Sequence, residues 1–462
     1  MTQQLAYTSK NAWQKYNTEL DRLKLAELAR EYIDFLNTCK TERETILHVY
    51  DKLQRAGFTQ DASTDKVVIP LREKALFAAV RGSANPGVGF NLIAAHADSP
   101  RLDFKQHPFI EQAGIVQAKT HYYGGIRKYQ WLARELAIHG VIALENGQKV
   151  VVNIGEAADE PVFCIADLLP HLAKKQGQQK LSEAFEAEKL NIILGHMPHE
   201  ESDSDDENEK TKNPIREQIL NKLNSLYNIK EEDLITAELE AVPAGSARFV
   251  GFDQSLIGGY GQDDRICVFC ALNALLEASV NNPGRNLALM IWDKEEIGSD
   301  GATGASSKFM EYCMEDVAKA WGEKSLSKIM LNTRAISADV TASLDPDYQD
   351  VHEKQNAALI GHGPCFSKYT GSGGKYGASE ADAEFYASVR AILNKAAIPW
   401  QAAELGKVDS GGGGTVALFL AAQGMNVIDL GPALLSMHSP FEISSVADLY
   451  ATREAYREFL LN

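Results

Sequence analysis

Two adjacent glutamates, Glu295 and Glu296, are the residues of this sequence best suited to chemistry. They follow an apolar run, residues 287–291, that is typical of a strand buried on both faces, and they precede a Gly/Ser/Ala-rich stretch that can turn tightly. Ligands and catalytic groups collect at the carboxyl ends of such strands in open α/β sheets. One glutamate could bind a cation while its neighbour acts on a water molecule as general base, although a Glu-Glu pair on a solvated turn is the commoner case.

Further acidic and imidazole groups recur where a predicted strand ends or a predicted helix begins. They are His96, Asp263, Asp339 and His438. Together with Glu296 they form a mixed nitrogen and oxygen donor set that suits zinc, with cobalt or manganese tolerated. If these side chains meet, we expect two divalent cations about 3.5 to 4 Å apart with one carboxylate bridging them.

Asp98 lies two residues beyond His96, on the same side of an extended chain, so it could accept the second ring N–H and fix the tautomer. Each candidate also has a structural explanation. A single His at a strand end is more often a buried structural residue, and an Asp at a helix start, such as Asp263, is a common N-cap. The metal hypothesis therefore depends on these residues meeting in space.

The elements that must position these groups alternate between helices and strands. Helices are predicted at residues 12–38, from the capping box of Thr41 and Glu44 to near Gly57, from Asp263 onward, at 379–394, from Thr415 onward and at 446–461. Strands are predicted at residues 75–80, 89–95, 287–291, 334–338 and 426–430. This order predicts an α/β layered fold.

Between residues 101 and 250 the sequence becomes β-rich. Asn146-Gly147 separates two apolar runs and predicts a hairpin, and residues 234–242 predict another strand. We expect an inserted domain at 101–250 that divides a second domain into residues 1–100 and 251–462. The acidic run at residues 200–209 predicts a solvated, mobile loop, and a calcium site there is the less favoured alternative.

Composition excludes several classes of partner. The formal net charge of -17 argues against binding to nucleic acid or to an anionic membrane surface. The six cysteines are scattered, the first ten residues lack the apolar core of a signal peptide, and no apolar stretch approaches the roughly 20 residues that span a bilayer. We therefore expect a cytoplasmic protein.

Two further motifs indicate structure rather than chemistry. Cys267 and Cys270 fall within a helical pattern without a second cysteine pair, which favours a buried helix face over a zinc or redox site. The glycine run at 411–414 lacks the Lys-Ser/Thr of a phosphate-binding loop, so close backbone packing or an approach to substrate is favoured.

Five short motifs occur in order along nearly the whole chain. They are His96-Ala97-Asp98-Ser99-Pro100, Gln262-Asp263-Asp264-Arg265, Asp293-Lys294-Glu295-Glu296-Ile297-Gly298-Ser299, Ser337-Ala338-Asp339 and Ser436-Met437-His438-Ser439. Together they resemble the signature of the M18 family of metalloaminopeptidases. The Asp-Asp-Arg and Asp-Lys-Glu-Glu-Ile segments are more similar to its aminopeptidase I and bacterial branches than to aspartyl aminopeptidase.

The resemblance implies a zinc-peptidase-type α/β/α sandwich with an inserted β-rich dimerisation domain, and a homo-oligomer in which dimers assemble into a dodecamer. It implies a two-zinc centre whose ligands are His96, Asp263, Glu296, Asp339 and His438, with Asp263 bridging. In the same comparison Glu295 is the general base and Asp98 is the partner of His96.

The resemblance also implies two substrate-binding residues. Pro170-His171-Leu172-Ala173 resembles a segment of the inserted domain whose His reaches the active site of a neighbouring subunit. Lys368 follows Gly363-Pro364 and resembles a substrate-contacting lysine, although the spacing differs from that of the family. Residues 369–378 depart from the aspartyl enzymes, which weighs against an acidic substrate preference.

The predicted function is removal of the N-terminal residue from peptides with a free amino terminus, with neutral or hydrophobic residues preferred. An aspartyl or glutamyl aminopeptidase is the alternative within this class. A catalytically idle oligomeric binding protein is the alternative of another class, and the intact set of ligand and base positions argues against it. A glycosidase that uses Glu295 and Glu296 fails because adjacent residues rarely face each other across the roughly 5 to 9.5 Å that paired carboxyls need.

Overall fold

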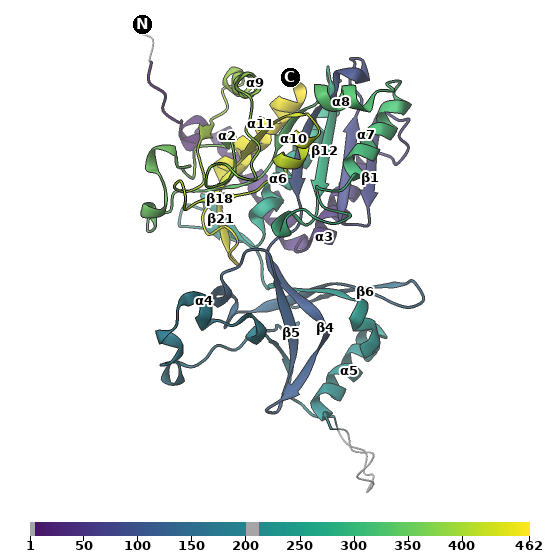
Figure 1. Ribbon diagram of the computed structural model, residues 1–462, viewed down its shortest axis with the longest axis vertical. Coiled ribbons are helices and arrows are strands. Elements are labelled where there is room, and N and C mark those ends of the chain that lie inside the picture. The colour runs from purple at the N-terminus through teal and green to yellow at the C-terminus, as the bar shows by residue number, and fades with distance from the viewer. Residues whose placement is uncertain (1–4, 200–211) are drawn as a thin grey trace. The chain divides into compact units, whose positions relative to one another are not determined.

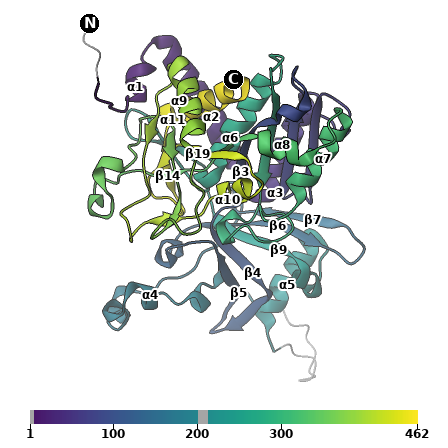
Figure 2. The same ribbon diagram turned by 45° about the horizontal axis from the view of Figure 1, so that its top comes forward.

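The computed structural model describes residues 5–199 and 212–462, and the chain divides into two compact units (Figures 1 and 2). Unit 1 contains Met1–Ser99, Ala247–Met437 and Phe441–Asn462, and unit 2 contains Pro100–Ser246 and His438–Pro440. The chain passes between the units at Ser99/Pro100, Ser246/Ala247, Met437/His438 and Pro440/Phe441. The acidic run at 200–209, and with it the loop or calcium-site hypothesis, lies outside the described residues.

Unit 1 is built on an eight-stranded sheet with the order β1-β2-β12-β3-β13-β19-β15-β17. Its strands are β1 (Lys66–Leu71), β2 (Ala75–Val80), β3 (Phe90–His96), β12 (Asn286–Trp292), β13 (Arg334–Ser337), β15 (Cys365–Ser367), β17 (Gln401–Ala402) and β19 (Asn426–Gly431). The four central strands β12, β3, β13 and β19 are parallel to one another, whereas β2 runs antiparallel to β12 and β15 runs antiparallel to β19. The strands predicted from the sequence are therefore present, and they lie mostly at the centre of the sheet.

Helices cover both faces of this sheet because alternate residues of each strand point to opposite sides. In β3, Ile93 and Ala95 join one apolar core, whereas Leu92 and Ala94 join the other. Helices of the first core are α1 (Ala12–Lys15), α2 (Glu19–Thr38), α3 (Glu42–Arg55), α6 (Gln262–Ala278), α9 (Ala383–Lys395) and α11 (Val446–Leu461). Helices of the second core are α7 (Phe309–Ala320), α8 (Leu326–Asn332) and α10 (Ala417–Ala422). The mixed α/β fold of unit 1 therefore has an apolar core on each side of the sheet.

Three small sheets complete unit 1. They are β10 (Arg248–Val250), β11 (Leu256–Gly259) and β21 (Glu442–Ser445); β14 (Thr341–Ala342) and β20 (Ala433–Leu434); and β16 (Gly371–Ser372) and β18 (Gly412–Gly413). The predicted glycine run thus enters a short strand, β18, where Gly412 has φ +142° and its Cα faces the carbonyl of Gly371 too closely for a side chain. Close backbone packing is therefore confirmed for this run.

Unit 2 is organised around a six-stranded antiparallel sheet with the order β7-β6-β9-β4-β5-β8 (Figure 1). Its elements are β4 (Arg101–Gln112), β5 (Ile115–Tyr123), β6 (Leu136–Ala143), β7 (Lys149–Ile154), α4 (Leu181–Ala184), β8 (Ile192–Gly195), α5 (Pro214–Tyr227) and β9 (Glu238–Pro243). A separate apolar core that includes Ile138, Ile142 and Leu239 lies against it. The predicted hairpin is confirmed by the pairing of β6 with β7.

Four predicted helix and strand limits were wrong. The predicted helix at 12–38 is interrupted after Lys15, because Thr18 caps a new helix by accepting the N–H of Asp21 in a capping box. The strand expected from residue 234 begins only at Glu238, after a 3-10 turn, Glu231–Thr236. Helices expected from 379 and 415 begin at Ala383 and Ala417.

The cysteines support a structural role. Cys267 and Cys270 are buried in α6, and burial raises the pKa of both thiols above the ordinary value. All six cysteines of the chain are unpaired. Within the described residues, no helix combines the length and the apolar character that crossing a bilayer requires.

A buried carboxylate in the first turn of α11 makes stability depend on pH. Asp448 is fully buried and accepts the backbone N–H groups of Gly361 and Gly363, each at 2.6 Å. Burial raises its pKa to about 7 from the ordinary value of 3.8. Between these two pKa values the folded state holds a proton on Asp448 that the unfolded state releases. The contribution of protonated Asp448 to the free energy of unfolding is therefore complete below about pH 4 and is lost as the pH rises to about 7.

We expect Asp448→Asn to be less stable than the wild type at pH 5 by about 1 to 3 kcal/mol, because one buried N–H loses its acceptor. The difference should shrink by pH 8, where the wild type carries the cost of its own buried charge. Urea unfolding of both proteins at pH 5 and pH 8 measures this difference in the free energy of unfolding. An equal difference at pH 5 and pH 8 would show that Asp448 does not titrate as described.

Candidate metal centre

Three neighbouring parallel strands bring the predicted ligands to one edge of the sheet. β3 lies between β12 and β13, with His96 opposite Trp292 and Ala94 opposite Ser337. His96 therefore ends β3 beside the turn that follows β12, and Asp339 follows β13 at the same edge. This is the carboxyl edge at which α/β enzymes place their functional groups.

Asp263 reaches the same place from the start of α6. Asp263 and Asp264 have non-helical backbone angles, and the peptide bond between them is cis. One carboxylate oxygen of Asp263, Oδ1, lies 3.3 Å from Nε2 of His96. The carbonyl of Asp263 accepts a hydrogen bond from the hydroxyl of Ser99 at 2.7 Å. The helix predicted from Asp263 therefore begins with an irregular turn that directs this side chain toward the sheet edge.

His96, Asp263 and Asp339 form a group that could hold a cation. Each offers one ligand atom, and these atoms all lie within 4.8 Å of one another. His96 and Asp263 are buried and Asp339 is half-buried. Glu296 also offers an oxygen within 4.8 Å of one from Asp263. One imidazole nitrogen with several carboxylate oxygens fits the donor preference of zinc.

Asp98 organises the turn that carries the two glutamates. Its two carboxylate oxygens accept the backbone N–H groups of Glu295 and Glu296, both at 3.1 Å. Nδ1 of His96 hydrogen-bonds to the backbone carbonyl of Asp98 at 3.0 Å and lies 3.4 Å from its carboxylate. With Nδ1 as the donor, the lone pair of His96 is on Nε2, which faces Asp263 and lies 3.9 Å from Glu295. That tautomer is the one a metal-binding histidine needs.

The electrostatics of the cluster favour a cation. Burial raises the pKa of Asp339 well above its usual range, and repulsion from Asp263 and Asp264 adds to this effect. Burial alone would lower the pKa of His96, but the neighbouring carboxylates raise it well above its usual range. Nε2 of His96 is buried and lies 3.3 Å from Oδ1 of Asp263. Among the described residues, no atom forms a hydrogen bond of good geometry with this nitrogen. A divalent cation would offset the carboxylate repulsion and give Nε2 a partner.

The remaining candidates lie in other parts of the chain. His438 belongs to the short segment His438–Pro440 that groups with unit 2, where its Nδ1 lies 3.0 Å from the carbonyl of Gly125. His171 lies in a 3-10 turn of unit 2, Pro170–Leu172, and is exposed. Their roles at a metal or substrate site stay predictions.

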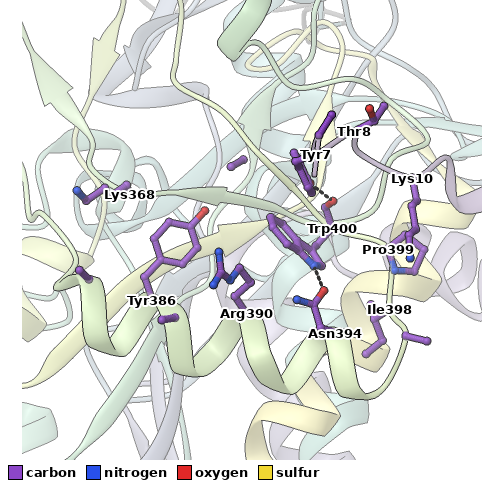
Figure 3. A pocket seen from close by; sticks show the side chains of 15 residues that line it. Tyr7, Thr8, Lys10, Lys368, Tyr386, Arg390, Asn394, Ile398, Pro399 and Trp400 are labelled. Carbon is purple, nitrogen blue, oxygen red and sulfur yellow. Dashed lines mark hydrogen bonds between the residues drawn. The ribbon is translucent and has the colours of Figure 1, made fainter. Parts of the chain in front are cut away.

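Lys368 follows β15 and lines a pocket of unit 1 with a volume of about 780 Å³ (Figure 3). Helix α9 and an N-terminal segment contribute to this pocket, and Tyr7 stacks on Trp400 at a ring distance of 5.0 Å within it. Nζ of Lys368 lies 3.6 Å from a carboxylate oxygen of Glu380. The lining contains none of the residues of the His96 group. A substrate-binding role for Lys368 therefore stays a prediction.

Asp264 is a buried member of the cluster to which the sequence analysis gave no role. Its carboxylate accepts the backbone N–H of His96 at 3.4 Å, and burial raises its pKa. Its position next to Asp263 in the Asp-Asp-Arg motif was an available signal. Glu442, which contacts the same turn, begins a short strand and carries no spacing signal that could have identified it.

A sheet edge at which buried imidazole and carboxylate groups could hold a cation beside a glutamate is the arrangement that metal-dependent hydrolases use. The family model described as aminopeptidase I zinc metalloprotease (M18) matches residues 35–460. The chain belongs to the M18 family of metalloaminopeptidases.

Similar proteins support this membership over the full length of the chain. The probable M18 family aminopeptidases 1 of Thermotoga maritima and Clostridium acetobutylicum are 46% and 44% identical, each over 98% of both chains. The crystal structure of an M18 aminopeptidase from Thermotoga maritima has a TM-score of 0.92 at 45% identity, and the match covers 98% of this chain and 99% of that one. The predicted family and the predicted enzyme class, a metalloaminopeptidase, are confirmed.

More distant relatives include an aspartyl aminopeptidase of Caenorhabditis elegans, which is 27% identical over 94% of this chain and 95% of its own. The structure of the Saccharomyces cerevisiae mApe1 dodecamer has a TM-score of 0.76 at 22% identity and shares the fold over 94% of this chain and 97% of that one. The greater similarity to bacterial M18 enzymes than to aspartyl aminopeptidase agrees with the sequence analysis.

Proposed function

We propose that this M18 aminopeptidase uses two divalent cations, most suitably zinc, with cobalt or manganese as alternatives. The observation that carries the proposal is the convergence of ligand atoms from His96, Asp263 and Asp339 within 4.8 Å. We assign these three residues to one ion and Glu296 and His438 to the other, with Asp263 shared. His438 enters this set because its motif resembles that of the family.

The bound cations would polarise the first peptide carbonyl and favour ionisation of water. Glu295 accepts a proton from the attacking water and delivers it to the leaving amine, as a positioned general base. Asp98 supports both partners of this step, because it holds the backbone N–H of Glu295 and lies against Nδ1 of His96. A rigid support of this kind keeps the general base and the metal ligand at a fixed position relative to each other.

We propose that unit 1 is a zinc-peptidase-type α/β/α sandwich, supported by its apolar cores on both sides of the sheet. We assign unit 2 to dimerisation and place twelve copies in the assembly, as in the yeast dodecamer. In such an assembly the exposed His171 would reach a neighbouring subunit's active site, and Lys368 would contact substrate. The unpaired cysteines support a cytoplasmic location.

We propose peptides with a free amino terminus as substrates, with neutral or hydrophobic N-terminal residues preferred. This preference rests on the resemblance of the Asp-Asp-Arg and Asp-Lys-Glu-Glu-Ile segments to the aminopeptidase I and bacterial branches. The aspartyl alternative is supported by the 27% identical aspartyl aminopeptidase of Caenorhabditis elegans. A catalytically idle binding protein is disfavoured because the ligand and base positions are all retained.

A profile of aminoacyl chromogenic substrates with zinc, cobalt and manganese supplied in turn tests the proposed function. We expect the highest kcat/KM with a neutral or hydrophobic residue, and no hydrolysis of its N-acetylated form or by chelator-treated protein. A maximum with aspartyl or glutamyl substrates would overturn the preference. Absence of turnover with every metal would support the binding protein instead.

A further inference from the structure

The backbone that carries Asp263 is held by a buried glutamate from a distant part of the sequence. Glu442 begins β21 and is only 1% exposed. One of its carboxylate oxygens, Oε2, accepts the backbone N–H of Gln262 at 2.5 Å and that of Asp263 at 3.2 Å. A single oxygen thus fixes two consecutive peptide groups, the second of which belongs to the proposed bridging ligand.

These N–H groups need an acceptor from outside the helix. The first N–H groups of an α-helix have no partner within it, and a side-chain cap usually supplies one. Gly261, which precedes α6, has no side chain and adopts a left-handed φ of +72°, where a Cβ would overlap the guanidinium of Arg265. Because the turn lacks a local cap, Glu442 takes the place that a capping residue would have.

The rest of the network fixes Glu442 itself and the carbonyl group of Asp263. β21 pairs with β11, with Glu442 opposite Gly259. The side-chain amide of Gln262 donates to the carbonyl of Glu442 at 2.7 Å and accepts from the hydroxyl of Ser444 at 2.6 Å. Ser99 donates to the carbonyl of Asp263 from the loop after β3. The N–H of Asp263 is therefore held by one element and its C=O by another.

We propose that Glu442 is a positioning residue of the metal centre. By holding the turn at Gln262 and Asp263, it aims the Asp263 carboxylate at His96 and Asp339 without binding the ion. The inference rests on the proposed function. Zinc–carboxylate bonds are about 2.0 to 2.2 Å long, so a ligand shifted by half an ångström binds poorly. Outer groups that orient ligands typically contribute about 10- to 100-fold to metal affinity or activity.

The test compares Glu442→Ala and Glu442→Gln with Asp448→Asn. Asp448 is the matched control because its buried carboxylate also accepts two backbone N–H groups, but from a segment that carries no proposed ligand. The zinc Kd is measured by competition with a chelating dye, kcat and KM are measured at saturating zinc, and Tm is measured for each protein.

We expect Glu442→Ala to weaken zinc binding by about 10- to 100-fold and to lower kcat with little change in KM. Glu442→Gln keeps an acceptor oxygen and should show a smaller, measurable loss, since neutral hydrogen bonds are weaker than charged ones. Asp448→Asn should lose stability but keep the zinc Kd of the wild type.

Three results would overturn the inference. They are a wild-type zinc Kd and kcat in both Glu442 variants, a Glu442→Gln variant as impaired as Glu442→Ala, and an equal loss of zinc affinity in Asp448→Asn. If Glu442→Ala does not fold, Glu442→Gln against Asp448→Asn decides the question in the same way. Failure of the wild type to bind any divalent cation would instead overturn the proposed function.

Discussion

Replacing Glu295 by Gln is expected to lower kcat by about 10² to 10⁴ and to leave the metal content near that of the wild type. Glu295 is half-buried, and its carboxylate lies 3.9 Å from Nε2 of His96, which places it beside the proposed ions. Gln keeps the size and the backbone N–H bond to Asp98. It cannot accept a proton from water, so the loss should appear in kcat more than in KM.

The neighbouring Glu296 provides the matched control. It lies on the same turn, and its N–H also donates to Asp98 at 3.1 Å, but it is assigned to a metal ion rather than to the proton transfer. Glu296→Gln should therefore lose metal as well as activity, as measured by elemental analysis of the dialysed proteins. Near wild-type turnover in Glu295→Gln, or equal metal loss in both variants, would remove Glu295 from its role as base.

The sequence predicted the elements of unit 1 that depend on local pattern. Runs that are buried on both faces, such as β12 and β3, are apolar throughout, and parallel strands place their carboxyl ends together. For this reason His96, Glu296 and Asp339 could be assigned to one sheet edge before the structure was known. The five motifs added the family, which no single residue could have indicated.

Features that depend on contacts between distant segments could not be predicted. The break between α1 and α2 arises from a cap at Thr18 inside an otherwise helical pattern. The Asp98 carboxylate was expected to serve His96, yet it also holds the N–H groups of Glu295 and Glu296. Glu442 acts on a turn far from it in sequence. A backbone N–H that needs an acceptor leaves no trace in residue spacing.

The proposed metal centre should also make the stability of the protein depend on its ions. A cation present at about 1,000 times its Kd stabilises the folded state by about 4.1 kcal/mol, and chelation removes this contribution. Asp339→Asn should lose most of the stabilisation by the ion it binds. Thermal unfolding with and without zinc measures the difference between the two proteins.

In the metal-free protein the effect of Asp339→Asn should have the opposite sign. Burial and the charges of Asp263 and Asp264 raise the folded-state pKa of Asp339 above its ordinary value of 3.8. The folded state then keeps a proton that the unfolded state releases, so stability is lost as the pH rises above about 4. Asn cannot ionise, so the variant should be more stable than the metal-free wild type at pH 7, and the difference should grow as the pH rises from about 4 to 7.

Asp350→Asn is the control for this reversal, because Asp350 is exposed and should leave both the metal-loaded and the metal-free stability unchanged. A metal-free Asp339→Asn protein that is less stable than metal-free wild type at pH 7 would mean that Asp339 stabilises the fold without an ion. The carboxylate cluster would then be a structural network. The predicted reversal follows only if these side chains are held together at a cost to stability that a cation offsets.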